Sequence, residues 1–448
     1  MNKKRWALLL VGVLLVAGYI KLFYKTYSEK VVVENADGIA TLDVKRITNT
    51  VIWQYITTPS LWKMGSLFSS SDKVSWSDMV KIPDYVFIFH IKEQPAKAWY
   101  TVLHIKDKPD FEKGLVQFQF QNRPGTKEYF STQYSIEFIQ NGEQLLVGNL
   151  AVEDKQYIRQ AADLLFIQQK YINKETLQKN IDAASHFSFQ LNQASGIKEM
   201  MVTGNFDKHS LSLEAAILPS TSFNFSSNTF RYVSGDVCAL GFTQPPANLY
   251  NNISDSVKLK ASRLLNFDID SIMKPSNQYY QLDIRGIKTR VDSAISYEYD
   301  KDFNQVEKVV VNNVDEPVFK LNISGNNVSD IYNYWKNHQK IEETPAGALF
   351  TPMPLVKSYA ELESPTDLSI TSNNYKRELR DATFNGILYL HLSLSKIPAS
   401  VLKYLPDNIV HTTSNIESAD LSVKNGRGNI QVNLELVKRK NDSPIISW

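Results

Sequence analysis

The chain has 448 residues, of which 43% are hydrophobic and 21% are charged, so it is long enough for two or three domains and has the composition of ordered globular proteins. Its 49 basic and 47 acidic residues leave a net charge of only +2, which argues against the strongly basic surface of a nucleic-acid-binding protein. The single cysteine, Cys238, excludes an internal disulfide, and its apolar neighbours from Val237 to Phe242 predict a buried thiol.

The first two dozen residues join a basic cluster to an apolar run. Lys3, Lys4 and Arg5 precede an unbroken apolar stretch from Trp6 to Ile20. A helix that spans a bilayer needs roughly 20 largely apolar residues, a length that is reached if Lys21 extends its charge towards the headgroups. The sequence therefore predicts an N-terminal transmembrane helix with the lipid bilayer as its partner. The predicted anchor residues are Trp6, Leu8, Leu9, Leu10, Val11, Val13, Leu14, Leu15, Val16 and Ile20.

A cleavable secretory signal is the alternative interpretation of this run, because Val16, Ala17 and Gly18 resemble a cleavage site. Tyr19 stands where a bacterial lipoprotein signal has its cysteine, which excludes that kind of lipidation. An uncleaved signal anchor is preferred, and both interpretations export the remainder of the chain. Since the contiguous basic cluster favours a cytoplasmic N-terminus, we expect a single-pass protein of the bacterial inner membrane whose bulk lies in the periplasm.

Patterns in the first half predict strands and helices in alternation. Asp43 is the expected N-cap of an amphipathic helix that extends to Tyr55. Asn141-Gly142 lies between two apolar runs and predicts a hairpin with a type I′ turn. The other expected elements are strands at 31–33, 38–42, 85–91, 99–105, 187–191, 198–206 and 210–218, a helix opening at 109–110, and helices at 153–170 and 175–185.

The second half again alternates strands and helices, after a polar boundary at 219–230. A second hairpin is expected at Asn425-Gly426. The other expected elements are strands at 237–242, 279–284, 293–299, 305–311, 319–323, 367–371 and 386–394 and helices at 254–265 and through 331–335. The segment 319–335 echoes 145–165, because in both a strand ends at Gly-Asn and a helix follows, and this short echo leaves duplication and chance equally open.

These elements together predict an α+β fold class. The expected architecture is an N-terminal transmembrane helix followed by two β-rich α+β halves with mainly antiparallel sheet, and a duplicated fold is left open. The expected domains are a membrane anchor with a juxtamembrane segment at 1–30, a first α+β domain at 31–225 and a second at 226–448.

Motifs that carry chemistry are missing from the sequence. No pair of histidines has the spacing of a zinc site, and His90, His104 and His391 fall inside expected strands, where a hydrogen-bonded structural role is preferred. Asp300, Asp302 and Asn304 have the spacing that opens a calcium loop, but Gln305 replaces its glycine, so a solvated turn is the preferred interpretation. We assign no catalytic, cofactor-binding or metal-binding residue, expect no cofactor, and regard an enzymatic activity as the least supported reading.

The combination of an anchor, tandem strand-and-helix units and no catalytic motif resembles uncharacterised single-anchor exported proteins of bacterial envelopes. The resemblance is one of architecture and depends on the patterns at 43–55, 134–149 and 319–335. It implies a periplasmic α+β protein and transfers no active site.

Two functions are therefore expected. The first is a membrane-anchored, non-enzymatic binding or assembly module that contacts another envelope protein, for instance through a sheet edge. The alternative is a protein that binds or carries an apolar ligand such as a lipid, because 22 Phe, 22 Tyr and 7 Trp can line an apolar pocket, although core packing explains these aromatic residues more simply.

Overall fold

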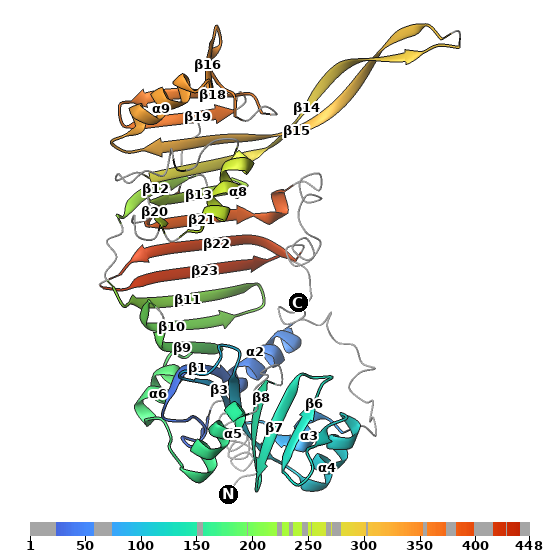
Figure 1. The fold of residues 1–448 in the computed structure, drawn as a ribbon, viewed down its shortest axis with the longest axis vertical. Coiled ribbons are helices and arrows are strands. Elements are labelled where there is room, and N and C mark those ends of the chain that lie inside the picture. The colour runs from blue at the N-terminus through green and yellow to red at the C-terminus, as the bar shows by residue number, and fades with distance from the viewer. Residues whose placement is uncertain are drawn as a thin grey trace, which may run out of the picture. The chain divides into compact units, whose positions relative to one another are not determined.

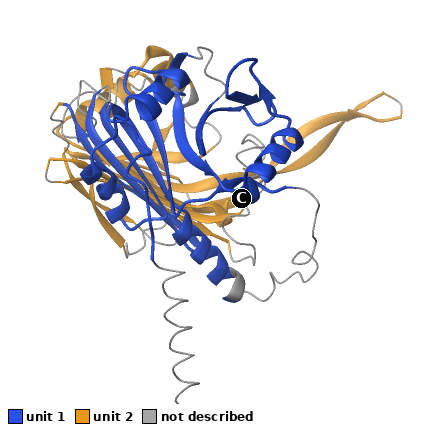
Figure 2. Cartoon of the chain, turned by 90° about the horizontal axis from the view of Figure 1, so that it is seen from below, with its two compact units in different colours: residues 1–220, 440–448 blue, residues 221–439 orange. Residues whose placement is uncertain are grey.

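The computed structural model describes residues 24–57, 74–149, 156–194, 196–221, 226–232, 236–243, 250–251, 253–265, 270, 279–301, 303–352, 356–372, 382–397, 415–426 and 428–439. The chain divides into two compact units (Figure 2). Unit 1 is Met1–Ser220 with Lys440–Trp448, and unit 2 is Thr221–Arg439.

Unit 1 is built on an antiparallel sheet (Figure 1). The strands pair in the order β5 (Gln121–Asn122), β6 (Glu128–Ser131), β7 (Ile136–Asn141), β8 (Gln144–Asn149), β4 (Trp99–Ile105), β3 (Tyr85–Ile91), β1 (Ala36–Asp43), β9 (Phe187–Ala194), β10 (Ile197–Phe206) and β11 (Ser210–Pro219). The short strand β2 (Val80–Lys81) pairs with β4. Gly142, with a φ of 61°, turns the chain between β7 and β8, which confirms the predicted hairpin. The expected type I′ turn is wrong, because Asn141 pairs with Gln144 and Gly142 is the one residue of the turn with a positive φ.

Three helices of unit 1 begin where a short polar side chain satisfies a free backbone N–H group. Asp43 accepts a hydrogen bond from the Arg46 backbone N at 2.8 Å, which confirms the predicted N-cap. Asp107 accepts from Asp110 N at 3.0 Å, and Asn173 accepts from Glu175 N at 2.7 Å. The helices are α2 (Val44–Thr57), α3 (Trp76–Met79), α4 (Lys108–Gln117), α5 (Gln156–Ala162), the π-helical turn η2 (Asp163–Ile167) and α6 (Lys174–Asp182).

Unit 1 has two apolar cores, which lie on opposite faces of β8. Leu146 packs with Phe89 of β3 and Leu165 of η2, whereas Leu145 packs with Phe111 of α4 and Phe138 of β7. Because successive side chains of a strand point to opposite faces, helices cover both faces of the sheet at β8.

Unit 2 is also built on an antiparallel sheet. Its strands pair in the order β16 (Ile341–Thr344), β17 (Gly347–Phe350), β18 (Ser358–Ser364), β19 (Asp367–Ser372), β15 (Gln305–Ser324), β14 (Tyr279–Tyr299), β13 (Cys238–Thr243), β21 (Leu388–Ser393), β22 (Ile416–Asn425) and β23 (Ile430–Lys438). A separate ribbon pairs β12 (Asn228–Tyr232) with β20 (Ala382–Gly386). The helices are α8 (Asp255–Leu265), α9 (Val328–Asn337) and the short 3₁₀ turn η4 (Leu394–Lys396).

The core of unit 2 lies between α9 and the sheet. Ile331 and Trp335 of α9 pack with Phe319 of β15, Phe350 of β17 and Ile370 of β19. A smaller cluster joins the β12–β20 ribbon to the sheet, since Phe230 packs with Ala239 of β13 and Tyr389 of β21. The predicted hairpin at Asn425-Gly426 is confirmed as the connection between β22 and β23.

The two units share one strand order. The correspondence follows chain order. The strands β1, β3 and β4 of unit 1 correspond to β13, β14 and β15 of unit 2. The strands β5 to β8 correspond to β16 to β19, and β9 to β11 correspond to β21 to β23. The helices follow the same scheme, because α2 and α8 each follow the first of these strands, and α4 and α9 each follow the third. The echo expected from sequence is wrong in its alignment, since it equated β8 with β15, which takes the place of β4.

The expected α+β fold class is wrong. Antiparallel strands make up far more of the described residues than helices do, and the described helices are short, with α2 of 14 residues the longest of them. Local amphipathic patterns predicted α2, α4, α5, α6, α8 and α9 as elements but missed α3 and η4, and they did not show how much of the chain the strands occupy.

The expected transmembrane helix falls in a segment that the structure does not describe. Its residues, from Trp6 to Ile20, lie outside the described part of the chain. Within the described part, no helix combines the length and the apolar character needed to cross a membrane.

Two glycines of neighbouring strands provide a test of the packing in unit 2. A Cβ added to Gly241 of β13 would lie 2.5 Å from Cδ1 of Phe230, which is 1% exposed and cannot move aside, whereas a Cβ added to Gly286 of β14 would meet nothing within 4 Å. We expect Gly241→Ala to lower the free energy of unfolding by about 1–3 kcal/mol through overpacking. Gly286→Ala, the control, is expected to leave it unchanged or to raise it by up to about 1 kcal/mol. Urea unfolding curves measure both, and equal midpoints would contradict the described packing.

Candidate functional site

The hairpin of β14 and β15 extends away from the rest of unit 2 (Figure 1). Near its base the strands belong to the sheet, since β13 pairs with residues 279–284 and β19 with residues 320–324. Beyond that point β14 and β15 pair only with each other, from Gly286 opposite Val318 to Tyr299 opposite Gln305. We call residues 286–318 the arm; among the described strands, no third strand pairs with it.

The arm exceeds what the fold requires. The strands that hold the same places in unit 1, β3 and β4, are 7 residues long each and are joined directly by a short connection. In unit 2 the corresponding strands have 21 and 20 residues. Since a two-stranded ribbon is only marginally stable alone in water, the additional length adds exposed surface and no core.

The distal arm, residues 291–313, has one apolar face. Directly paired residues share a face, so Ile295 lies beside Val309 and Tyr297 beside Glu307. The large apolar side chains on this face are all more than half exposed: Val291 (67%), Ile295 (61%), Tyr297 (53%), Tyr299 (71%), Val309 (64%) and Val311 (61%). Glu307 is the single charged residue among the paired positions of this face, which we call the apolar arm face.

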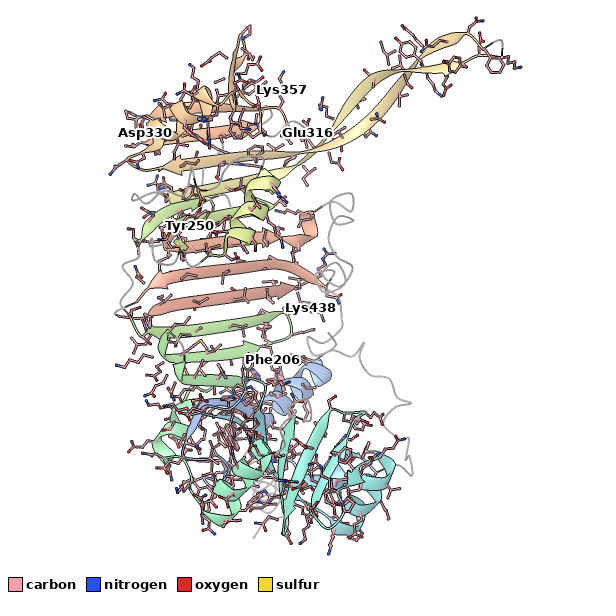
Figure 3. The ribbon with its side chains drawn as sticks, in the orientation of Figure 1. Phe206, Tyr250, Glu316, Asp330, Lys357 and Lys438 are labelled. Atoms are coloured by element: carbon pink, nitrogen blue, oxygen red, sulfur yellow. The ribbon has the colours of Figure 1, made fainter. Side chains whose placement is uncertain are left out.

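The opposite face of the arm is mixed: it carries Ala294, Val306, Val310 and Val314 among charged residues that form ion pairs. Arg290 Nε lies 2.6 Å from Glu316 Oε1 at the base of the arm, where Figure 3 labels Glu316, and Lys308 pairs with Glu298 nearer the tip. Pro317 lies on β15 where no third strand is described, as expected for a residue without a backbone N–H to donate to a sheet.

The turn at the tip explains the acidic spacing noticed in the sequence. Asp300 Oδ1 accepts a hydrogen bond from the Asn304 backbone N at 2.8 Å, and Asp300 N donates to Asn304 O at 3.0 Å. Phe303, with a φ of 59°, is 85% exposed at this turn. Asp300 therefore stabilises a turn, as preferred from the sequence, while Asp302 lies outside the described residues.

A second candidate site is a cleft of about 970 Å³ in unit 1 between α2 and the β10–β11 turn. One wall is the side of α2 that carries Ile52 and Trp53, which are 46% and 67% exposed. The opposite wall is the turn Asp207–His209, which Asp207 closes by accepting hydrogen bonds from the backbone N of His209 at 2.7 Å and of Ser210 at 2.8 Å. Burial acts to raise the pKa of Asp207, but these hydrogen bonds outweigh it and hold the pKa below its ordinary value.

Ion pairs fix the N-terminal end of α2 at this cleft. The buried Asp43 carboxylate pairs with Lys25 and lies 3.7 Å from Arg46 Nε. Arg46 also donates to the Ala184 carbonyl, and Lys45 Nζ lies 3.7 Å from Asp84 Oδ1. The start of α2 is therefore held to the sheet by several charged groups, whereas its second half presents apolar side chains to the cleft.

His186 connects α2 to the sheet at the back of the cleft. Its Nε2 lies 2.8 Å from Thr50 Oγ1, its Nδ1 lies 3.2 Å from Asn205 Oδ1, and its ring stacks on Phe206, which Figure 3 labels. Burial lowers the pKa of the imidazole below its ordinary value; a hydrogen bond to Asn205 opposes this shift, and the Arg46 charge adds to it.

The residues singled out by sequence are dispersed. The ten anchor residues lie outside the described part of the chain. His90 and His391 lie in strands and are hydrogen-bonded, to Asp37 at 2.6 Å and to Asp420 at 2.8 Å, as the sequence interpretation expects. Among the described residues, no group of three or more His, Cys, Asp and Glu side chains is arranged to hold a metal ion.

Sequence reasoning missed both candidate sites. It predicted the distal strands of the arm at 293–299 and 305–311 but placed breaks at 285–292 and 312–318, so the hairpin had an ordinary length. The available signal was the alternation of Val291, Ile295, Tyr297 and Tyr299 with small or polar residues, which continues past the expected strand start. No sequence signal brings α2 to the β10–β11 turn.

Comparisons with known proteins add no family. No family model matches the sequence, and no curated protein matches it. One solved structure with a similar chain is "Structure of crystal form I of TP0453", at 10% identity and a TM-score of 0.27, with 54% of this chain and 87% of that chain covered. A likeness at this TM-score carries no inference about fold or function.

The lowered pKa of His186 predicts acid sensitivity of the α2 attachment. The unfolded chain binds a proton at the ordinary value of about 6.5, while the folded protein does so only at lower pH. Between these two values the unfolded state holds more protons, so the free energy of unfolding decreases as pH falls through that window and is fully restored above it. Urea unfolding between about pH 7.5 and about pH 5 measures this loss, which His186→Gln is expected to reduce.

His209 provides the matched control, because its side chain is exposed in the turn on the other side of the cleft. His209→Gln is expected to leave the acid-dependent loss in place. An unchanged pH profile in His186→Gln would show that the loss arises elsewhere.

Proposed function

We propose that this protein is a non-enzymatic binding and assembly module of the bacterial cell envelope, and that the apolar arm face joins it to a second copy of the same chain. The observation that carries the proposal is the row of exposed apolar side chains on the distal arm. Soluble proteins rarely expose contiguous apolar surface of this kind unless it forms an interaction site.

The shape of the arm supports a role in binding. A long ribbon with free edges and an apolar face is an aggregation hazard unless it is covered. Its strands exceed those at the same places in unit 1, so neither the strand order nor the core requires this length. Retaining such a surface is explained most simply by a partner that covers it.

The composition of the face supports a second copy as that partner. Two copies related by a two-fold axis bring the same patch together, so the patch must tolerate its own image. Glu307 is the single charged residue among the paired positions of the apolar arm face, and the centre of this face at Ile295 and Val309 is aliphatic. Two such faces therefore pack without like charges facing each other at the centre. If the six apolar side chains lose their exposed area, two arms bury about 1,400 Å² in total, within the standard size range of stable interfaces.

The proposed location follows from the N-terminal sequence. Lys3, Lys4 and Arg5 before the apolar run from Trp6 to Ile20 support attachment to the bacterial inner membrane with a cytoplasmic N-terminus and a periplasmic bulk. The lipid bilayer is then the first partner, and the second copy meets the arm in the periplasm. Attachment to one membrane also raises the effective concentration of the two arms.

A substitution on the apolar arm face tests the assembly. Ile295→Asp introduces a charge at the centre of the face, and we expect it to convert a dimer of the full-length protein in maltoside micelles into a monomer, because burying an unpaired carboxylate is strongly unfavourable. Ser296→Asp is the control, since it adds the same charge to the neighbouring residue, which faces the other way, and is expected to leave the dimer intact. Sedimentation equilibrium measures both masses.

Site-specific crosslinking in intact cells separates a second copy from another partner. A benzophenone side chain at Tyr297 is expected to yield a conjugate with twice the mass of the protein, and one at Glu298, on the opposite face, is not. A conjugate with a different protein would overturn the second copy as partner. A monomer in solution together with no conjugate in cells would overturn the arm as a binding surface.

A further inference from the structure

From the cleft in unit 1 we infer a binding site for an anionic amphiphile, a molecule with one acidic headgroup and an alkyl chain. The inference goes beyond the proposed function, because it concerns α2 and the β10–β11 turn and does not involve the arm. The cleft, of about 970 Å³, has the size of a small-molecule site.

The apolar part of the cleft fits the alkyl chain. Ile52 and Trp53 are neighbours in the second half of α2 and are 46% and 67% exposed, so an alkyl chain that lies against them removes apolar surface from water. Most of the surface that lines the cleft is apolar, as expected of a site in which a few polar groups fix the orientation of the ligand.

The charges at the cleft select an acidic headgroup. Lys208 is only partly exposed, and no hydrogen bond or ion pair to its ammonium group is found within the described residues. Lys25 and Arg46 add positive charge, although both already pair with Asp43. Asp207 is the acidic residue that lines the cleft, and its carboxylate is engaged by the backbone of its own turn. Lys208 is therefore the cation available to a carboxylate or phosphate.

Gln54 gives independent evidence of a ligand. Its side chain lines the cleft and the residue is 5% exposed, yet neither its amide nitrogen nor its amide oxygen has a hydrogen-bond partner among the described residues. Leaving both atoms of a buried amide without partners is unfavourable and is uncommon in folded proteins. An oxygen of an acidic headgroup accepts a hydrogen bond from the Gln54 amide nitrogen and so supplies one of the two missing contacts, which explains why the protein retains an amide where an aliphatic side chain would be more stable.

Free carboxylates and phospholipids share this chemistry, and the test distinguishes them. Full-length protein in phosphatidylcholine nanodiscs is dialysed to equilibrium against labelled decanoate, decanoyl-lysophosphatidylglycerol or decanol, with empty nanodiscs as the blank. We expect saturable binding of at least one acidic probe and none of decanol. The acidic probe that binds more tightly identifies the class of headgroup.

Three variants test the assigned residues. Lys208→Glu is expected to weaken binding of the acidic probe by about tenfold or more, because it reverses the charge that meets the headgroup. Lys198→Glu is the matched control: it makes the same change on β10 at the end away from the cleft and is expected to leave binding within about twofold. Gln54→Leu is expected to weaken binding and at the same time to raise the urea midpoint, since it removes an unpartnered buried amide.

Gln54→Leu is expected to weaken binding and to raise the urea midpoint, and this combination distinguishes a ligand contact from a purely structural role. The absence of saturable binding by both acidic probes would overturn the inference, as would equal binding of decanol or equal weakening by the two lysine variants. None of these outcomes depends on the oligomeric state of the arm, so failure here and failure of the proposed assembly are distinguishable.

Discussion

The continuous antiparallel pairing of β14 with β15 is the interaction on which unit 2 depends. At its base the pair forms the middle of the sheet, where Tyr280 and Phe319 contribute to the core beneath α9. After a register shift between Ile284 and Gly286, the two strands stay paired without a third strand to Tyr299 opposite Gln305, so the same two strands both build the core and form the exposed arm. Arg290 and Glu316 pair near the base of the arm, whereas the large apolar side chains of its distal face are more than half exposed.

Comparison of the two units shows that the arm is an addition to their shared strand order. Unit 1 has the same strand order with short β3 and β4 strands, and helices cover both faces of its sheet near β8. Unit 2 covers the equivalent region with α9 and then lengthens the central hairpin beyond it. A surface added to a fold that is complete without it is best explained by contact with another molecule, because apolar surface in water otherwise reduces solubility.

The cleft beside α2 presents a related conflict between stability and function. The first half of α2 is held firmly by Asp43, Arg46 and His186, whereas the second half leaves Trp53 in water and Gln54 buried without partners. Both features lower stability relative to simple alternatives at the same positions. Local violations of this kind concentrate at binding sites, where a ligand later supplies the missing contacts.

The sequence alone determined the local features whose causes are local. Asp43 caps α2 and Asn141-Gly142 turns between β7 and β8 because both effects act within a few residues of the chain. Tertiary pairing decided the rest: Gly286, Asn312 and Pro317 read as breaks in a single strand, yet β14 and β15 stay paired through all three positions, with one register shift next to Gly286. The cleft likewise joins Lys25, α2 and Lys208, which no local pattern relates. Long-range backbone hydrogen bonds and burial, which depend on residues distant in sequence, therefore decided both the strand-dominated fold and its two candidate sites.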